Sequence, residues 1–263
     1  MNLPLKGMNI MVTREKKQAE PISNLIRQYG GVPIEIPLLI YDWIDQPSNR
    51  LAFEQLDEFD WLFFTSVNGV RYFIKSIEAY GLSLDHFHSV QIGAVGKKTS
   101  EKLKEYGFTV DFEPTIYTAE YMGDEFLRQH HPKKVLLVRG TLSRPTLPEF
   151  FTEQNIPFSS VTVYATRVNV DIKNELINEL KSNTIHVLTF MSPSTIEAFF
   201  QLGKEEIDEN TLGRLCICIG TTTRKKAEEM GFQRILIPEN FTGVSMIHRL
   251  VDHMDNRKGI KHE

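Results

Sequence analysis

QIGAVGKKTSEKLKEYGF (Gln91–Phe108) and CICIGTTTRKKAEEMGF (Cys216–Phe232) are two copies of one sequence pattern. Each copy has a short apolar run, a glycine, a threonine three residues later, a helical run and a final Gly-Phe pair. Four positions match at one offset of 124 residues, since 220−96, 223−99, 231−107 and 232−108 all give that number. A constant offset indicates an internal repeat, here of a strand-to-helix unit.

The residues at each strand-to-helix junction favour the binding of an anion. Gly96 and Gly220 end the apolar runs, and a glycine there lets the backbone turn sharply or approach a ligand closely. Thr99 and Thr223 follow at the positions predicted for the helix N-caps. The N-terminus of a helix carries unpaired N–H donors and the positive end of the helix dipole. The alternative is that both are ordinary strand-to-helix caps.

Composition predicts a soluble globular protein, and the length allows one large or two ordinary domains, of which the repeat favours two. The chain has 263 residues, of which 41% are hydrophobic and 24% are charged. Its net charge of −4 gives no basic footprint for a nucleic acid. No apolar run approaches the roughly 20 residues that span a bilayer, and the N-terminus lacks a signal-peptide layout. Cys216 and Cys218 lack a zinc or disulfide pattern, so we interpret them as core residues in a reducing cytoplasm.

Strand and helix patterns alternate about five times in each half, which predicts parallel sheets covered by helices. Ligands bind such sheets at the carboxyl ends of the strands. The uncharged polar residues at the predicted strand ends are Thr65, Ser66, Asn68, Thr99, Ser192, Ser194, Thr221, Thr222 and Thr223. The basic residues near the same ends are Arg14, Lys97, Lys98, Arg139, Arg144, Arg224 and Lys225. Together they favour a ligand with several carboxylates or phosphates, although solvated surface charge is the alternative for the basic residues.

Motifs for other chemistries are missing from the sequence. GAVGKKT is not a P-loop, because Gln91 stands where the first glycine is needed and Lys98 where a hydroxyl residue is needed. Neither a G-x-G-x-x-G fingerprint nor a G-x-S-x-G elbow occurs. His86 and His88 are interpreted as a surface pair and not as metal ligands. No pair of carboxylates stands at a strand end, which argues against glycoside hydrolysis.

Tyr164 is the one polar aromatic residue near the point where the chain crosses from one half to the other. Its hydroxyl could donate a proton or orient a leaving group. The alternative is a half-buried tyrosine of a strand, with no role beyond packing.

The chain resembles the uroporphyrinogen-III synthase family in motifs that run in the family's order over nearly the whole sequence. These motifs are Val12-Thr13-Arg14, Phe64-Thr65-Ser66-Val67-Asn68-Gly69-Val70, Val95-Gly96-Lys97-Lys98-Thr99, Arg139-Gly140 with Arg144, Val163-Tyr164-Ala165-Thr166, Ser192-Pro193-Ser194 and Ile219-Gly220-Thr221-Thr222-Thr223. The resemblance implies an α/β fold of two similar domains, each a parallel sheet flanked by helices, with a ligand cleft between them. Residues 1–36 with 168–263 would form one domain and residues 37–167 the other, joined by a two-stranded linker.

The resemblance also implies a reaction, the dehydrating cyclisation of hydroxymethylbilane to uroporphyrinogen III with inversion of ring D, in haem biosynthesis. Such a hydro-lyase needs no cofactor and no metal. Tyr164 is then the expected catalytic residue. The expected substrate-binding residues are Arg14, Ser66, Asn68, Gly96, Thr99, Arg139, Arg144, Ser192, Ser194, Gly220, Thr222 and Thr223.

We expect a cytoplasmic monomer that takes a small-molecule tetrapyrrole, with no nucleic acid or membrane partner and with transient contact to the preceding enzyme of the pathway. Two other classes stay open at this point. One is a two-lobed binding or sensory module for a polyanionic ligand, and the other is a two-domain glycosyltransferase, which would need a nucleotide site.

Overall fold

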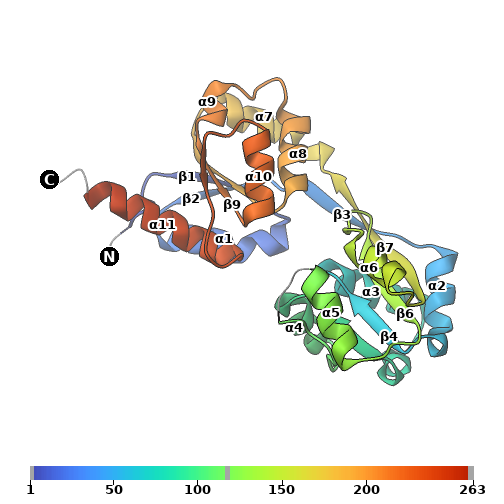
Figure 1. Ribbon diagram of the computed structural model, residues 1–263. Coiled ribbons are helices and arrows are strands. Elements are labelled where there is room, and N and C mark those ends of the chain that lie inside the picture. The colour runs from blue at the N-terminus through green and yellow to red at the C-terminus, as the bar shows by residue number, and fades with distance from the viewer. Residues whose placement is uncertain (1–2, 116–118, 260–263) are drawn as a thin grey trace. The chain divides into compact units, whose positions relative to one another are not determined.

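The structure is a computed structural model that describes residues 3–115 and 119–259, and it divides the chain into two compact units (Figure 1). Unit 1 comprises Met1–Ile40 and Arg167–Glu263, and unit 2 comprises Tyr41–Thr166. The chain thus leaves unit 1 after Ile40 and not after residue 36, and it returns at residue 167 instead of 168. The first difference arises because Ile36, Leu38 and Leu39 are buried in the hydrophobic core of unit 1.

Unit 1 contains a five-stranded parallel sheet in the order β10-β9-β8-β1-β2. Its strands are β1 (Asn9–Val12), β2 (Val32–Glu35), β8 (Ile185–Phe190), β9 (Leu215–Cys218) and β10 (Arg234–Leu236). Its helices are α1 (Lys16–Gln28), η3 (Val170–Ile172), α7 (Lys173–Lys181), α8 (Pro193–Gly203), α9 (Glu209–Leu212), α10 (Thr221–Glu229) and α11 (Gly243–Gly259). The strand β2, which contains Pro33, lies at the edge, where a missing N–H donor costs no ladder hydrogen bond.

Both faces of the unit 1 sheet are covered by helices. α1 and α11 pack side by side on one face, where they bury Ile10 and Ile217 of the sheet (Figure 1). α7, α8 and α10 cover the other face, which carries Met11, Cys216 and Cys218. Neighbouring residues of one strand therefore enter opposite cores, as the alternation of side chains in a strand requires. This burial on both faces explains why the strands are apolar at almost every position.

Unit 2 contains a second five-stranded sheet, in the order β3-β7-β6-β4-β5. Its strands are β3 (Leu39–Trp43), β4 (Trp61–Phe64), β5 (Gln91–Ala94), β6 (Val135–Gly140) and β7 (Phe158–Val168). Its helices are α2 (Pro47–Glu54), η1 (Leu56–Glu58), α3 (Val67–Tyr80), η2 (Leu84–Ser89), α4 (Lys97–Glu105), α5 (Ala119–Gln129) and α6 (Thr146–Glu153). The pairs among β4, β5, β6 and β7 are parallel.

The strands β3 and β7 carry the chain between the two units. The N–H of Ile44 donates to the carbonyl of Val163 (3.0 Å), and the N–H of Asn169 donates to the carbonyl of Leu38 (2.9 Å). Residue numbers rise along one strand as they fall along the other, so the two strands run antiparallel. The carboxamide of Asn169 also donates to the carbonyl of Pro37 (2.8 Å). The connection is therefore a hydrogen-bonded pair of strands, as the resemblance implied.

The internal repeat has the same structure in both units. Gln91–Phe108 forms β5 and α4, and Cys216–Phe232 forms β9 and α10. β5 lies parallel to β4, and β9 lies parallel to β8. After the first copy of the repeat, Phe112 forms an isolated parallel bridge with Gly93. In the described part of the chain, every helix is too short or too polar to cross a membrane.

Candidate functional site

The helices of the repeat begin at glycine, so the prediction of threonine N-caps is wrong. Gly96 is the N-cap of α4 and Gly220 is the N-cap of α10, and neither helix has a side-chain cap. Each helix thus starts three residues earlier than predicted, from a positive φ at Gly96 and from an extended backbone at Gly220. Thr99 and Thr223 therefore occupy the third helical position, where they are 4% and 3% exposed. Both threonine side chains are therefore buried and are not exposed donors.

In each unit, a serine caps the helix that follows the strand before the repeat, which is β4 in unit 2 and β8 in unit 1. The Oγ of Ser66 accepts from the N–H of Gly69 (2.9 Å) at the start of α3. The Oγ of Ser192 accepts from the N–H of Thr195 (3.2 Å) at the start of α8, and the Thr195 hydroxyl accepts in return from the N–H of Ser192. Each serine satisfies an N–H group that the helix geometry leaves unpaired. These two residues, which the sequence marked as binding hydroxyls, thus have a structural role as well.

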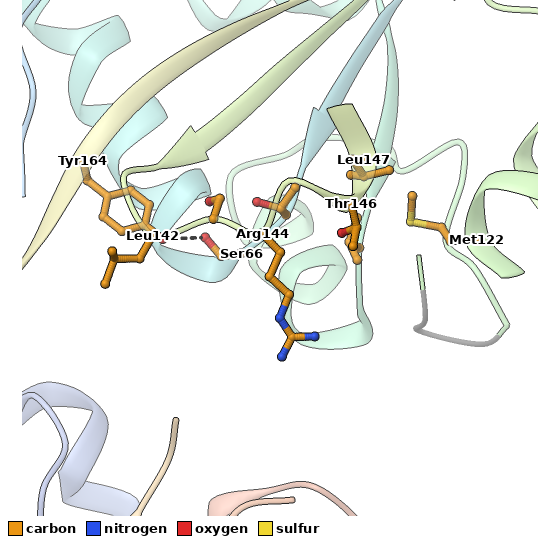
Figure 2. A pocket seen from close by; sticks show the side chains of 10 residues that line it. Ser66, Met122, Leu142, Arg144, Thr146, Leu147 and Tyr164 are labelled. Carbon is orange, nitrogen blue, oxygen red and sulfur yellow. Dashed lines mark hydrogen bonds between the residues drawn. The ribbon is translucent and has the colours of Figure 1, made fainter. Parts of the chain in front are cut away.

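A cavity of about 460 Å³ opens at the carboxyl ends of the unit 2 strands. Figure 2 shows the side chains that surround it. Its lining residues are Thr65, Ser66, Val95, Met122, Leu142, Ser143, Arg144, Thr146, Leu147 and Tyr164. The cavity combines an apolar wall with several hydroxyl groups and one cation, which suits an apolar ring that carries a carboxylate.

The cavity contains only part of the predicted site. Ser66, Arg144 and Tyr164 were predicted and line it. The apolar residues were missed, and they are Val95, Met122, Leu142 and Leu147. Leu142 could have been found, because an apolar residue directly after a predicted strand end and between polar neighbours is a candidate contact; it is 60% exposed. Met122 lies on α5, far along the chain, and no sequence signal connects it to the strand ends.

Tyr164 lines the cavity from β7. Its ring stacks on Tyr72, with centroids 5.4 Å apart, and meets Tyr41 edge-on at 5.9 Å. Its hydroxyl lies 3.2 Å from the Oγ of Ser66, as Figure 2 shows. Burial raises the pKa of Tyr164 above its ordinary value, and the hydrogen bond with Ser66 opposes this shift. Tyr164 is therefore a neutral phenol near pH 7, able to donate a proton.

The two predicted arginines after β6 differ in their roles. The guanidinium of Arg139 donates to the carbonyl groups of Ser143 (3.0 Å) and Arg144 (3.1 Å), so it holds the loop and does not line the cavity. Arg144 lines the cavity and is exposed. Its guanidinium extends away from the strands in Figure 2 and has no hydrogen bond or ion pair with the part of the chain that the structure describes. Arg144 is thus the cation that a carboxylate can reach.

Three further predicted residues of unit 2, Asn68, Gly96 and Thr99, lie at the same end of the sheet but outside the cavity lining. Asn68 is the second residue of α3. Thr65 does line the cavity, yet its hydroxyl oxygen is buried and has no hydrogen-bond partner among the residues that the structure describes. No group of three or more His, Cys, Asp or Glu side chains that could hold a metal occurs among residues 3–115 and 119–259.

The predicted residues of unit 1 gather at the carboxyl ends of β1, β8 and β9. Arg14 donates through its Nε to the carboxamide oxygen of Gln18 (2.6 Å). The Oγ atoms of Ser192 and Ser194 lie 2.9 Å apart. The remaining three predicted residues start α10, and they are Gly220, Thr222 and Thr223. Since β1, β8 and β9 are neighbours in the sheet, the structure brings all six residues to one edge of it.

Phe241 was missed by the sequence analysis and lies beside this edge. It is 57% exposed, and a Cβ added at Gly220 would lie 3.1 Å from its ring. The glycine therefore leaves room for an aromatic ring over the start of α10. A polar cavity of about 560 Å³ lies nearby on unit 1, and none of the predicted residues lines it. It is lined by Pro238, Glu239, Asn240, Ser245, His248, Arg249 and Asp252.

Comparison with known proteins identifies one family. The family model described as uroporphyrinogen-III synthase HemD matches residues 20–248. Uroporphyrinogen-III synthase from Chlorobaculum parvum is 30% identical over 247 residues, which cover 92% of this chain and 98% of the relative. The porphyrin biosynthesis protein HemD from Ruminiclostridium josui is 29% identical over 260 residues, which cover 96% of this chain. The chain spans 50% of the length of that second relative.

Solved structures of the same family share the fold. Uroporphyrinogen III synthase from Thermus thermophilus matches with a TM-score of 0.66 and 18% identity, over 95% of this chain and 99% of that one. The enzyme from Helicobacter pylori matches with a TM-score of 0.64 and 19% identity, over 94% and 99%. At this level of identity, the likeness supports the two-domain α/β architecture and does not assign individual site residues.

Proposed function

This chain belongs to the uroporphyrinogen-III synthase family, and we propose that it converts hydroxymethylbilane into uroporphyrinogen III with loss of water. Family membership makes it an enzyme of porphyrin biosynthesis and does not favour the binding module or the glycosyltransferase. The finer assignment, a hydro-lyase that closes the tetrapyrrole ring, rests on one observation. A buried, neutral tyrosine hydroxyl lies in a cavity that also presents Arg144, whose guanidinium has no partner within residues 3–115 and 119–259.

The chemistry requires little beyond a proton donor and correct positioning. When the terminal hydroxyl of the substrate leaves as water, a delocalised cation remains on the first ring. The substituted carbon of the last ring then attacks through a spiro intermediate, and that ring is inverted. Without an enzyme, the same substrate closes to the uninverted isomer. The main task of the enzyme is therefore to hold the substituted carbon of the last ring against the cation on the first ring, which is an effect of proximity and orientation.

The cavity of unit 2 offers groups for each of these tasks. Tyr164 would donate its proton to the departing hydroxyl, since a phenol with a raised pKa remains protonated near neutral pH. Val95, Leu142 and Leu147 would contact the apolar face of a pyrrole ring. Arg144 would bind a carboxylate of that ring through charge-assisted hydrogen bonds. The predicted residues of unit 1 other than the buried Thr223 remain proposed ligands for other carboxylates.

A coupled assay tests this function. Hydroxymethylbilane would be generated in place, the protein added, and the oxidised products separated into type I and type III uroporphyrin. We expect a strong shift towards type III, because the uncatalysed reaction gives type I. Type I product alone, from a folded and monodisperse sample, would contradict the proposal and favour the two-lobed binding module.

Removal of the Arg144 guanidinium should weaken substrate binding more than catalysis. For Arg144→Ala we expect KM to rise about 10-fold while kcat changes little, because one charge-assisted hydrogen bond contributes about 1.5–3 kcal/mol. Steady-state kinetics of type III formation measures both constants. Arg50→Ala is the matched control, since Arg50 is also exposed in unit 2 but pairs with Glu54 (2.8 Å) on α2. Equal effects of the two substitutions would remove Arg144 from the substrate site.

We also propose that the protein works as a monomer in the reducing cytoplasm, with transient contact to the preceding enzyme. The two cysteines support the reducing compartment. The sulfur atoms of Cys216 and Cys218 lie 3.7 Å apart, unlinked and buried. The hydrogen bond between them, together with burial, raises the pKa of the Cys216 thiol well above its ordinary value. Both residues are therefore buried parts of the core.

A further inference from the structure

We propose that Gly140 and Ser66 are positioning residues that hold the Tyr164 hydroxyl for proton donation; we call this pair the Tyr164 seat. The inference rests on the proposed function, because it assumes that Tyr164 donates the proton. It adds a residue, Gly140, that neither the sequence patterns nor the comparisons assign to the site. It also assigns Ser66 to the tyrosine instead of to the substrate.

A glycine is needed at position 140 because the ring of Tyr164 lies too close for a larger side chain, and not because the backbone conformation demands it. A Cβ added at Gly140 would lie 2.6 Å from Cε2 and 2.7 Å from Cε1 of Tyr164, and closer still to Cζ. Real Cβ atoms do not approach other atoms so closely, so any larger residue must move the ring. Gly140 is not among the described glycines with positive φ, so its backbone would accept alanine. The ring of Tyr164 thus lies directly on the end of β6.

The backbone around the seat is fixed by the same strand end. Gly140 pairs with Tyr164 after a register shift in the ladder between β6 and β7. The N–H of Thr141 donates to the carbonyl of Tyr164 (3.1 Å). The N–H of Gly140 donates to the Oγ of Ser143 (3.0 Å). These bonds tie both residues to the loop after β6. Because the backbone is held in this way, the ring can keep its position only while residue 140 has no side chain.

Ser66 provides the partner for the hydroxyl. Its Oγ lies 3.2 Å from the Tyr164 oxygen and also accepts from the N–H of Gly69 (2.9 Å) at the start of the 14-residue helix α3. A serine hydroxyl can accept from the phenol and, after proton transfer, donate to the phenolate. The positive end of the α3 dipole also favours the phenolate. Ser66 therefore stabilises Tyr164 in both protonation states.

Tyr164 gives up one proton to the departing hydroxyl and receives one back at the end of the reaction. The O–H bond of Tyr164 breaks, and a new O–H bond forms on the departing hydroxyl of the substrate. The C–O bond of the substrate breaks, and its electron pair leaves with the water molecule. The phenolate, which accepts a hydrogen bond from Ser66, regains a proton when a ring carbon loses one after ring closure.

Unit 1 shows that a serine cap alone does not create this arrangement. Ser192 caps α8 at the place that corresponds to Ser66 on α3. Its Oγ lies 2.9 Å from Ser194 and 3.4 Å from the hydroxyl of Thr195, with no tyrosine among its hydrogen-bond partners in the described chain. Both units therefore have the serine cap, but of these two serines Ser66 is the one with a described hydrogen bond to a tyrosine. This difference indicates a role beyond helix capping.

Gly140→Ala is the first test. We expect kcat for type III formation to fall at least 10-fold, with KM changed less than about 3-fold, because the ring shifts away from the reacting atoms. In a Tyr164→Phe background, the same substitution should cause no further loss, since no hydroxyl remains to be positioned. An equal loss in both backgrounds would show that Gly140 acts on something other than the Tyr164 hydroxyl and would overturn the proposal.

The pKa of Tyr164 gives a second readout, which a purely structural role would not move. Tyrosine Cζ signals would be followed by NMR from neutral to alkaline pH, with Tyr164→Phe used for assignment. Ser66→Ala should raise the pKa of Tyr164, since the donor to the phenolate is lost, and Ser66→Thr should restore it. Asp208→Ala is the control, because it removes the cap of α9, where Asp208 accepts from the N–H of Thr211 (2.8 Å).

The outcomes separate the seat from the function itself. An unchanged pKa in Ser66→Ala, or an equal rise in Asp208→Ala, would overturn the seat even if the wild-type protein makes type III product. If the wild-type protein makes type I product alone, the proposed function is wrong, and the Tyr164 seat, which rests on that function, is wrong with it. If Gly140→Ala does not fold, the NMR titration of the Ser66 variants still decides the question.

Discussion

Tyr164→Phe should slow the formation of type III uroporphyrinogen about 100-fold, because the substitution removes the phenol hydroxyl that lines the unit 2 cavity and is proposed to donate the proton. The ring itself would remain stacked on Tyr72 and would keep its place over Gly140. KM should therefore change little, and the loss should appear in kcat. Steady-state assays with separation of the two isomers would measure the effect.

Tyr80→Phe is the matched control for this prediction. Tyr80 belongs to the same unit, but its hydroxyl donates to the carboxylate of Asp45 (3.1 Å) and does not line the cavity. The control should retain the wild-type rate. Unchanged turnover in Tyr164→Phe would exclude proton donation by Tyr164. Catalysis would then rest on positioning of the substrate alone.

The largest expected effect on stability is the loss of a buried aromatic ring from the core of unit 2. Phe63 is fully buried on β4 and contacts the rings of Trp61, Phe126 and Phe151, with centroids 5.7, 4.9 and 6.0 Å away. Phe63→Ala should lower the free energy of unfolding by about 3–5 kcal/mol, since it removes this burial and leaves a cavity behind. Denaturant unfolding, followed by tryptophan fluorescence, would measure the change.

The tryptophan signal reports on unit 2, because both Trp43 and Trp61 lie within Tyr41–Thr166. Phe199→Ala is the control: Phe199 is fully buried on α8 in unit 1 and contacts Phe190 at 5.4 Å. Because the two units have separate cores, Phe63→Ala should shift the fluorescence transition and Phe199→Ala should shift it much less. Equal shifts would show that the units unfold together, against this prediction.

The architecture could be predicted because each of its signals is local. Apolar runs such as Leu215–Cys218 predict buried parallel strands, and the helical spacing from Val70 to Ile77 together with Gly81 predicts α3 and its end. The offset of 124 residues predicts two similar units without any knowledge of their contacts. Parallel strands expose their carboxyl ends at one edge, so Ser66, Arg144 and Tyr164 could be placed near a site from their positions alone.

Local patterns were thus enough to predict the two-unit α/β fold, the family and the end of each sheet that carries polar groups. The features that depend on distances between residues remote along the chain emerge only on folding. The tertiary structure starts α4 at Gly96 and buries Thr99, and it lets Arg139 hold a loop while Arg144 lines the cavity. It also places Tyr164 on Gly140, a contact across 24 residues that no local pattern encodes. Propensity and periodicity report a residue's neighbours along the chain, whereas a site depends on neighbours in space.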